Sequence, residues 1–130
     1  MSSRKPELET LSPFEWLIMN TVWDAERVSA REVMDRLPPE SQRAYTTIQT
    51  YLERLVEKGY LTKEKIGLVN FYQALIAREG VVEGETERFI NRVYQGSAPS
   101  LAAFLLKRDR LSAAELEQIK ALVGQGEDHD

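Results

Sequence analysis

Hydrophobic residues recur every three or four positions along most of the chain, which is the spacing of amphipathic helices. This spacing is interrupted once, by two short runs rich in β-branched and aromatic residues that are joined through Gly67 and predict a hairpin. The sequence therefore predicts three helices, a hairpin and three further short helices. The expected elements are helices at 13–24, 30–37 and 45–58, strands at 61–66 and 70–75, and helices between 82 and 123.

The predicted helix ends carry clear local signals. Ser12, Ser29 and Ser112 are each followed three positions later by a glutamate, which is the pattern of a capping box. Pro38 disfavours helical geometry at the residue before it and so ends the second helix. Gly59 can adopt the left-handed conformation that terminates the third helix.

The third helix, TTIQTYLERLVEKGYL, has an unusual polar face. Its hydrophobic residues Ile48, Leu52 and Leu55 are spaced to bury one side, and Thr46 and Thr50 stand on the other. Threonine is a poor helix former, so a merely solvated face would more often carry Lys, Glu, Gln or Ala. Threonine hydroxyls suit phosphate oxygens and base edges, which favours a DNA recognition helix whose N-terminal part enters the major groove.

Helix, short helix, capped third helix and hairpin form the layout of a winged helix-turn-helix. In this layout the turn, the third helix and the hairpin wing supply the DNA contacts. We expect these contacts from Arg43, Tyr45, Thr46, Thr47, Thr50, Arg54, Lys63 and Lys65. Non-DNA interpretations stay open at this point: a solvated threonine face, a Tyr45 half-buried in the turn, an Arg54–Glu57 surface pair, and wing lysines that protect a strand edge.

The composition excludes most catalytic and metal chemistry. Of the 130 residues, 42% are hydrophobic and 29% are charged, which is typical of a soluble folded protein. Cysteine is absent, and the single histidine, His129, adjoins the C-terminal residue. Triads and zinc sites need several positioned partners, so we predict no enzyme, no metal and no cofactor.

The charge and hydropathy patterns bear on location and partners. No segment has the features of a signal peptide or a membrane span, so a cytoplasmic protein without membrane insertion is expected. The net charge is −4, which by itself argues against nucleic acid. Residues 41–65, however, carry five basic and three acidic side chains, so the predicted recognition segment is mildly basic.

Several stretches resemble the penicillinase-repressor family of the BlaI/MecI type, over residues 7–123. They are LSPFEWLIMNTVWD, TTIQTYLERLVEKGYL, FYQALI and GSAPSLAAFLLKRDRLSAAELEQIKALV. The expected fold class is mainly α, a winged helix-turn-helix followed by a C-terminal helical dimerisation region. The expected domains are a DNA-binding domain at 7–75 and a dimerisation region at 76–123, with flexible tails at 1–6 and 124–130.

The resemblance implies a homodimeric transcriptional repressor bound to a palindromic operator in double-stranded DNA. It also implies that some relatives are inactivated when a membrane sensor-protease triggers cleavage, which here would fall near Ala103, Phe104 and Leu105. The C-terminal helices would supply the dimer surface, because their apolar faces have too little mutual area to form an independent core. The expected dimer residues are Phe89, Ile90, Val93, Leu101, Phe104, Leu105 and Ile119.

Two departures from the family pattern limit what is expected. Relatives commonly carry basic residues around the wing glycine, whereas Ile66 and Leu68 flank Gly67 here, so a weaker wing–phosphate contact is expected. The cysteines of the copper-responsive branch are absent, which excludes that mode of sensing. The acidic net charge and the weakened wing leave an alternative function, a winged-helix module that binds proteins and not DNA.

Overall fold

The computed structural model describes residues 9–127 of the chain, with side chains as far as Leu122. The chain divides into two compact units, the first ending at Glu83 and the second beginning at Gly84. His129 lies outside the described residues, as do residues 1–6 of the expected tails. None of the helices described is long and apolar enough to cross a membrane.

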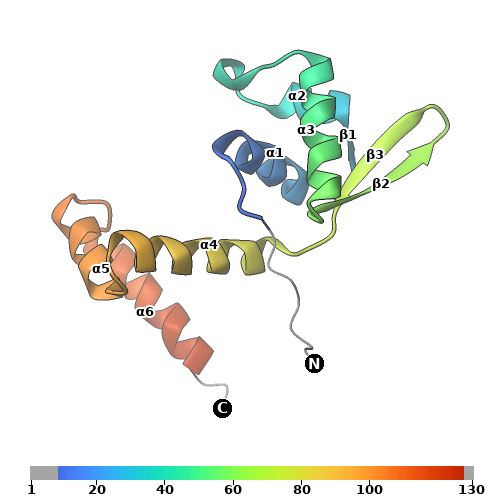
Figure 1. The fold of residues 1–130 in the computed structure, drawn as a ribbon. Helices are drawn as coiled ribbons and strands as arrows, with labels where there is room; N and C mark the ends of the chain where they lie inside the picture. Colours follow the sequence, from blue (N-terminus) through green and yellow to red (C-terminus); the bar gives the residue numbers. More distant parts are fainter. Residues whose placement is uncertain (1–8, 128–130) are drawn as a thin grey trace. The chain divides into compact units, whose positions relative to one another are not determined.

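The first unit has the predicted order of three helices followed by a hairpin (Figure 1). The first three helices agree with the sequence prediction to within about one residue, which is inside the usual uncertainty of element boundaries, whereas the fourth begins four residues earlier than expected. The elements are α1 (Pro13–Asp24), β1 (Val28–Ser29), α2 (Ala30–Arg36), a 3₁₀ turn (Pro39–Ser41), α3 (Tyr45–Glu57), β2 (Leu61–Ile66), β3 (Val69–Ala74) and the start of α4 (Arg78–Val93).

The three predicted capping boxes are all present. The Glu15 backbone N–H donates to the Ser12 hydroxyl oxygen at 3.3 Å, and the Ser12 N–H donates to the Glu15 carboxylate at 2.8 Å. The same reciprocal bonds join Ser29 with Glu32 at the start of α2, and Ser112 with the glutamate three positions later in the second unit. Each box satisfies two backbone donors that the helix itself leaves without partners.

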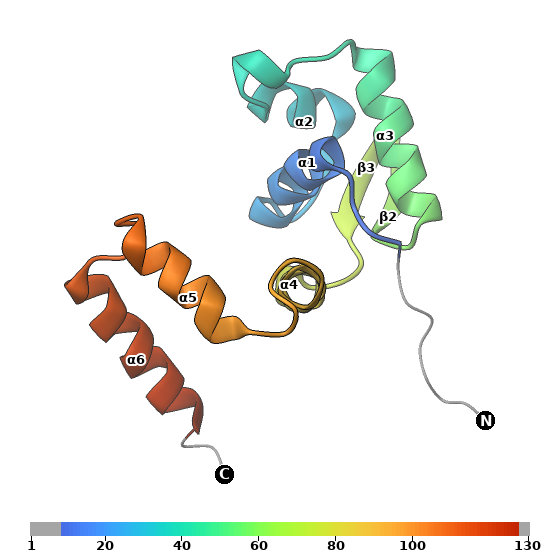
Figure 2. The ribbon, with the colours of Figure 1, turned by 60° about the vertical axis from the view of Figure 1, so that its left-hand side comes forward.

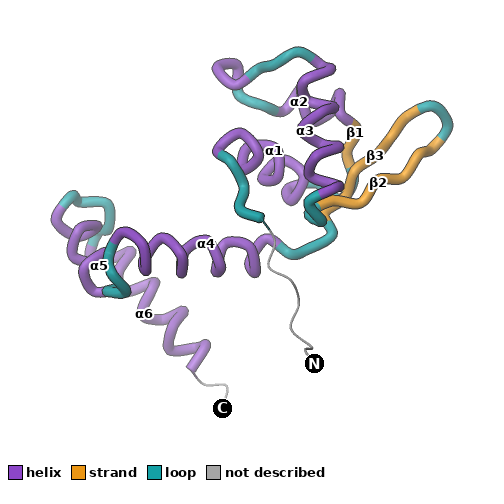
Figure 3. The backbone as a smooth tube through the Cα atoms, in the orientation of Figure 1, coloured by secondary structure: helices purple, strands orange, loops and turns teal. Residues whose placement is uncertain are grey.

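The wing is the hairpin of β2 and β3, and it belongs to a three-stranded antiparallel sheet with strand order β1-β3-β2 (Figure 3). The sequence did not predict β1, which is only two residues long and pairs Val28 with Tyr72. Gly67 and Leu68 form the two-residue turn between β2 and β3, and Gly67 has a φ of +65°. Glycine with positive φ in the first central position is the arrangement of a type II′ hairpin turn.

The core of the first unit lies where α1, α2 and α3 pack against the sheet. The apolar face predicted for α3 is fully buried, because Ile48, Leu52 and Leu55 have no exposed surface. Trp16 and Trp23, both half-buried, pack against this core, which makes them structural aromatics. The Trp23 indole N–H also donates to the Ile76 carbonyl at 3.0 Å.

A buried ion pair connects the start of α1 with the end of α3. Both carboxylate oxygens of Glu15 accept from the Lys58 ammonium, at 2.9 and 3.0 Å, and the Glu15 side chain is only 3% exposed. Burial alone would raise the pKa of Glu15, but the hydrogen bonds from Lys58 and Ser12 outweigh it and hold that pKa below its usual value. The carboxylate is therefore ionised and paired in the folded chain.

The second unit consists of the remainder of α4, α5 (Ala98–Lys107) and α6 (Ala113–Glu127). Figure 2 shows the three helices of this part of the chain in turn. α4 is followed by a turn in which Gly96 adopts a φ of +86°, and Ser97 caps the start of α5, where its side chain accepts from the Ser100 N–H. α6 continues to Glu127, into the segment expected from the sequence to be a tail. None of the described side chains from 84 to 122 is buried.

We expect Glu15→Gln to destabilise the fold by about 3 kcal/mol at neutral pH, because Lys58 would keep a partly buried charge without its partner. Since folding lowers the pKa of Glu15, its contribution is present at neutral pH and is lost as the pH falls through the carboxylate range. Urea unfolding at about pH 7 and about pH 3 measures both effects, and the stability difference between wild type and variant should shrink at the lower pH.

The matched control is Glu32→Gln, which alters the equivalent capping box of α2 at an exposed position. This change should cost less than about 1 kcal/mol. Equal losses in the two variants would show that the capping box, and not the ion pair with Lys58, accounts for the stability.

Candidate nucleic-acid interface

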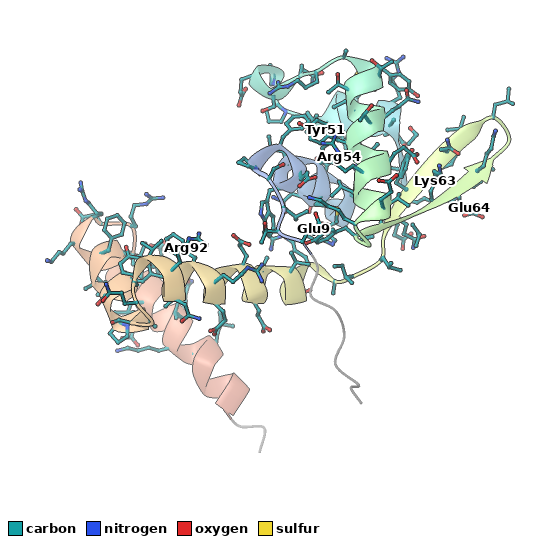
Figure 4. All side chains as sticks on the ribbon, in the orientation of Figure 1. Glu9, Tyr51, Arg54, Lys63, Glu64 and Arg92 are labelled. Atoms are coloured by element: carbon teal, nitrogen blue, oxygen red, sulfur yellow. The ribbon has the colours of Figure 1, made fainter. Side chains whose placement is uncertain are left out.

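The outward face of α3 and the adjacent side of the wing enclose an open, polar groove. Hydroxyl, amide and charged side chains line it, and Arg54 and Lys63 mark its helix side and its wing side in Figure 4. The lining residues are Thr46, Gln49, Thr50, Glu53, Arg54, Glu57, Asn70 and Tyr72. Three of the predicted DNA contacts, Thr46, Thr50 and Arg54, therefore share one surface.

The N-terminus of α3 differs from those of α1 and α2. Its N-cap is Ala44, and no side chain caps the first backbone N–H groups. The turn before it is instead held by Gln42, whose amide donates to the carbonyls of Met34 and Leu37 at 2.9 and 2.8 Å. An uncapped helix start leaves N–H donors and the positive end of the helix dipole available to a phosphate group.

The three threonines of α3 differ in exposure and in hydrogen bonding. Thr46 and Thr50 are exposed, whereas Thr47 is half-buried. The Thr50 hydroxyl donates to the Thr46 carbonyl at 3.0 Å, which satisfies its proton within the helix. The Thr50 oxygen keeps acceptor capacity, so it can accept from a base amino group while its methyl group remains free for apolar contact.

Aromatic rings hold the arginines around α3. The Arg54 guanidinium lies 5.2 Å from the Tyr51 ring centroid, and no ion pair joins it to Glu57. Arg43 lies 4.8 Å from the ring of Phe14 and donates to the carbonyl of the residue before it. Stacking on an aromatic ring restricts the orientation of a guanidinium and leaves its N–H donors available for hydrogen bonds.

Tyr45, the first residue of α3, is 39% exposed. The guanidinium of Arg31, from α2, lies 5.2 Å from its ring centroid. Tyr45 therefore contributes both an exposed hydroxyl-bearing ring and a contact that connects α2 with the start of α3.

Glu53 joins the recognition helix to the wing. Its carboxylate accepts from the Lys63 ammonium at 2.9 and 3.1 Å and from the Tyr72 hydroxyl at 2.5 Å. The hydrogen bond from Tyr72, reinforced by Lys63, lowers the pKa of Glu53 despite partial burial. Burial, followed by the bond to Glu53, raises the pKa of Tyr72 far above its usual value, so the pair is a carboxylate and a neutral phenol at neutral pH.

The two wing lysines are consequently not equivalent. Lys63 is neutralised by Glu53, whereas Lys65 has no ion-pair partner among the described residues. Lys65 lies opposite Asn70 in the ladder and two residues from Lys63. The side chains of Lys63 and Lys65 therefore lie on the same face of the wing, the face that contacts α3. Lys65 is therefore the wing cation available to a phosphate.

Sequence reasoning missed several residues of this surface. Gln49 and Asn70 line the groove, Arg31 stacks on Tyr45, and Gln42 holds the turn before α3. Gln49 lies one position before Thr50 on the predicted recognition helix, so its amide was a readable signal for base contact. The other three depend on contacts between segments that no local pattern indicates.

Neither the groove nor its surroundings have the chemistry of a metal centre. No group of three or more His, Cys, Asp or Glu side chains in the described part of the chain is placed to hold a metal ion. The surface instead combines an uncapped helix start, exposed hydroxyl and amide groups, and stacked arginines beside a β-wing. This combination defines a winged-helix DNA-binding protein.

Comparison with known proteins identifies the family. The penicillinase repressor family matches residues 11–125, and the chain belongs to this family. It is 31% identical over 113 residues to the penicillinase repressor of Bacillus licheniformis, covering 87% of this chain and 88% of that protein. It is 26% identical over 115 residues to the methicillin resistance regulatory protein MecI of Staphylococcus aureus (strain N315), covering 88% and 94%.

A solved structure supports the same assignment for the first unit. The DNA-binding domain of the repressor BlaI superposes with a TM-score of 0.50 at 31% identity, covering 57% of this chain and 90% of that one. The predicted family and the mainly α winged-helix class are thus confirmed. The chain is a transcriptional repressor and not an enzyme, and the protein-binding alternative is not favoured.

We expect Glu53→Gln to strengthen binding to any DNA duplex, because Lys63 would lose its charged partner and could neutralise a phosphate. The slope of log affinity against log salt concentration should steepen by about one for each wing that approaches DNA. Fluorescence anisotropy titrations of a random-sequence duplex over a range of salt concentrations measure this slope.

Glu64→Gln is the control. Glu64 lies on the same strand as Lys63, but it pairs with Arg27 on the opposite face of the wing. The substitution removes the same charge and should leave the slope unchanged. If both variants steepen the slope equally, the overall charge of the chain, and not the release of Lys63, determines the effect.

Proposed function

We propose that the chain represses transcription as a homodimer that binds a palindromic operator, with one α3 helix in the major groove of each half-site. The observation that carries this proposal is the start of α3, where an uncapped helix end, exposed threonines and the groove beside the wing coincide. A protein that binds operator DNA in this way acts in the cytoplasm, which is where we place it.

The surface divides into base contacts and phosphate contacts. Thr46, Gln49 and Thr50 lie on the N-terminal part of α3, which enters the groove in this class of motif, and we assign them to base edges. Arg43 and Lys65 flank that part, and we assign them to phosphates, which position the protein without specifying sequence. Arg54, one turn beyond Thr50, can reach either.

The exposed apolar side chains of the second unit support the proposal that the chain forms a dimer. Large apolar side chains remain accessible on its helices, with Phe89, Val93, Phe104 and Ile119 between 37% and 52% exposed. Ile90, Leu101 and Leu105 are half-buried. Burial of these side chains by a second copy would supply the missing core, because each well-buried large side chain contributes about 1.5–3 kcal/mol.

Dimerisation also explains how a small winged helix reaches useful affinity. Once one half-site is bound, the second contact becomes intramolecular, which raises the affinity for the whole operator without new contacts to DNA. Cleavage near Ala103, Phe104 and Leu105, triggered by a membrane sensor-protease, would remove α6 and part of the dimer surface. These residues lie within α5, so a protease would require local unfolding of that helix.

Thr50→Ala and Arg54→Ala test the assignment of DNA contacts. Each should weaken binding to the selected operator by about 1–3 kcal/mol and binding to random DNA by less, if the side chain contacts a base edge. The control is Arg92→Ala, which removes an exposed arginine from α4 (Figure 4). Equal losses on operator and random DNA would assign Thr50 or Arg54 to phosphate.

Phe104→Asp tests the dimer surface in the full-length chain. A buried carboxylate without a partner is strongly unfavourable, so sedimentation should show a shift from dimer to monomer and operator affinity should fall. Leu106→Asp is the control, because Leu106 is equally exposed (46% against 44%) but lies off the stripe formed by Leu101, Phe104 and Leu105. A wild-type chain that sediments as a monomer would contradict the proposal.

A further inference from the structure

The tip of the wing is apolar and exposed. Leu68, in the turn between β2 and β3, is 94% exposed, and its neighbours Ile66 and Val69 are 43% and 45% exposed. No other large hydrophobic side chain described in the chain is as accessible as Leu68. Gly67 makes the turn tight, so these three residues form a small apolar cluster at the end of the hairpin, in which Ile66 and Val69 pair with each other on the face opposite α3.

This cluster is continuous with the DNA-facing surface. Leu68, Val69 and Asn70 line a small pocket together with Tyr45 and Gln49 from the N-terminal part of α3. A duplex that receives this part of α3 in its major groove would therefore also meet the wing tip. The apolar tip is a poor partner for phosphate oxygens, because approaching them would strip water from charged groups without replacing it.

The polar residues just below the tip indicate how it could approach DNA. Lys65 and Asn70 lie opposite each other on the α3 side of the hairpin, and Lys65 has no ion-pair partner in the part of the chain described. A cation and an amide in this position suit the phosphates and acceptor edges that border a groove, while the apolar tip reaches past them. Minor-groove proteins use leucine and isoleucine in this way, as wedges between base steps.

We propose that the wing tip, led by Leu68, inserts into the minor groove beside each half-site as an apolar wedge. This inference rests on the proposed DNA-binding function and adds a second mode of recognition to it. Pyrimidine–purine steps separate most easily, so the wedge would favour such steps at positions that α3 does not contact. The missing basic residues around Gly67 then mark a different kind of wing contact, and not merely a weaker one.

The test uses the duplex that the intact chain selects from a random pool, with 2-aminopurine placed at the flanking step. We expect Leu68→Ala to weaken binding to this duplex by about tenfold per wing, the loss that corresponds to partial burial of a leucine. The salt slope should stay unchanged, because no charge is altered. Wild type should raise the 2-aminopurine fluorescence on binding, and Leu68→Ala should not.

Two further variants make the result specific to the tip. Leu75→Ala truncates another exposed leucine, 56% accessible, beyond the end of β3, and should leave affinity and fluorescence at wild-type values. Leu68→Met provides an apolar side chain of similar volume and should retain most of the affinity and of the fluorescence change.

The outcomes separate the wedge from the function on which it rests. If the selection enriches no duplex, DNA binding fails and the wedge fails with it. If a duplex is enriched but Leu68→Ala binds it as wild type does, with the same fluorescence, the wedge alone is overturned and the apolar tip belongs to a protein contact. A fall in affinity with a shallower salt slope also overturns the wedge, because it would show a lost phosphate contact.

Discussion

The burial of one face of α3 determines most of what the surface of the first unit can do. Ile48, Leu52 and Leu55 are fully buried and cannot turn outward without exposing the centre of the core, at about 2–5 kcal/mol for each lost side chain. With that face fixed, helical geometry places Thr46 and Thr50 on the opposite side. The core therefore positions the candidate DNA contacts, and of its buried residues Tyr72 also lines the groove.

Glu53 shows how this surface combines two competing demands. A carboxylate beside DNA is unfavourable, yet this one bonds both Lys63 and Tyr72 and so fixes the wing against α3. The bond to a buried tyrosine is hard to replace, because an unpaired buried hydroxyl would carry a desolvation cost. The bonds of Glu53 thus maintain the geometry of the groove, but they neutralise the charge of Lys63. The arginines and Lys65 are then the candidate cations for phosphate.

The sequence predicted the features that depend on neighbouring residues. The capping boxes, the hairpin around Gly67 and the apolar face of α3 each follow from a pattern within one short continuous segment, and the structure confirms them. It did not predict β1, the Glu53–Tyr72 bond or the Gln42 bonds to α2. The β1 pairing and the Glu53–Tyr72 bond arise only when distant segments pack together, and a two-residue strand has no period to detect. The Gln42 bonds span only eight and five residues, but they cross an irregular turn that has no periodic pattern.

The second unit differs from the first in how much of its apolar surface is buried. The first unit encloses a core of fully buried side chains, whereas the described residues from 84 to 122 include no buried side chain. In the proposed dimer the stability of this unit and the association of two copies are one equilibrium, so damage to either weakens both. Because two linked half-sites multiply affinity, a modest loss in the helical surface becomes a large loss at the operator. In the proposed mechanism a release signal would therefore act most effectively on the second unit, far along the chain from the candidate DNA contacts.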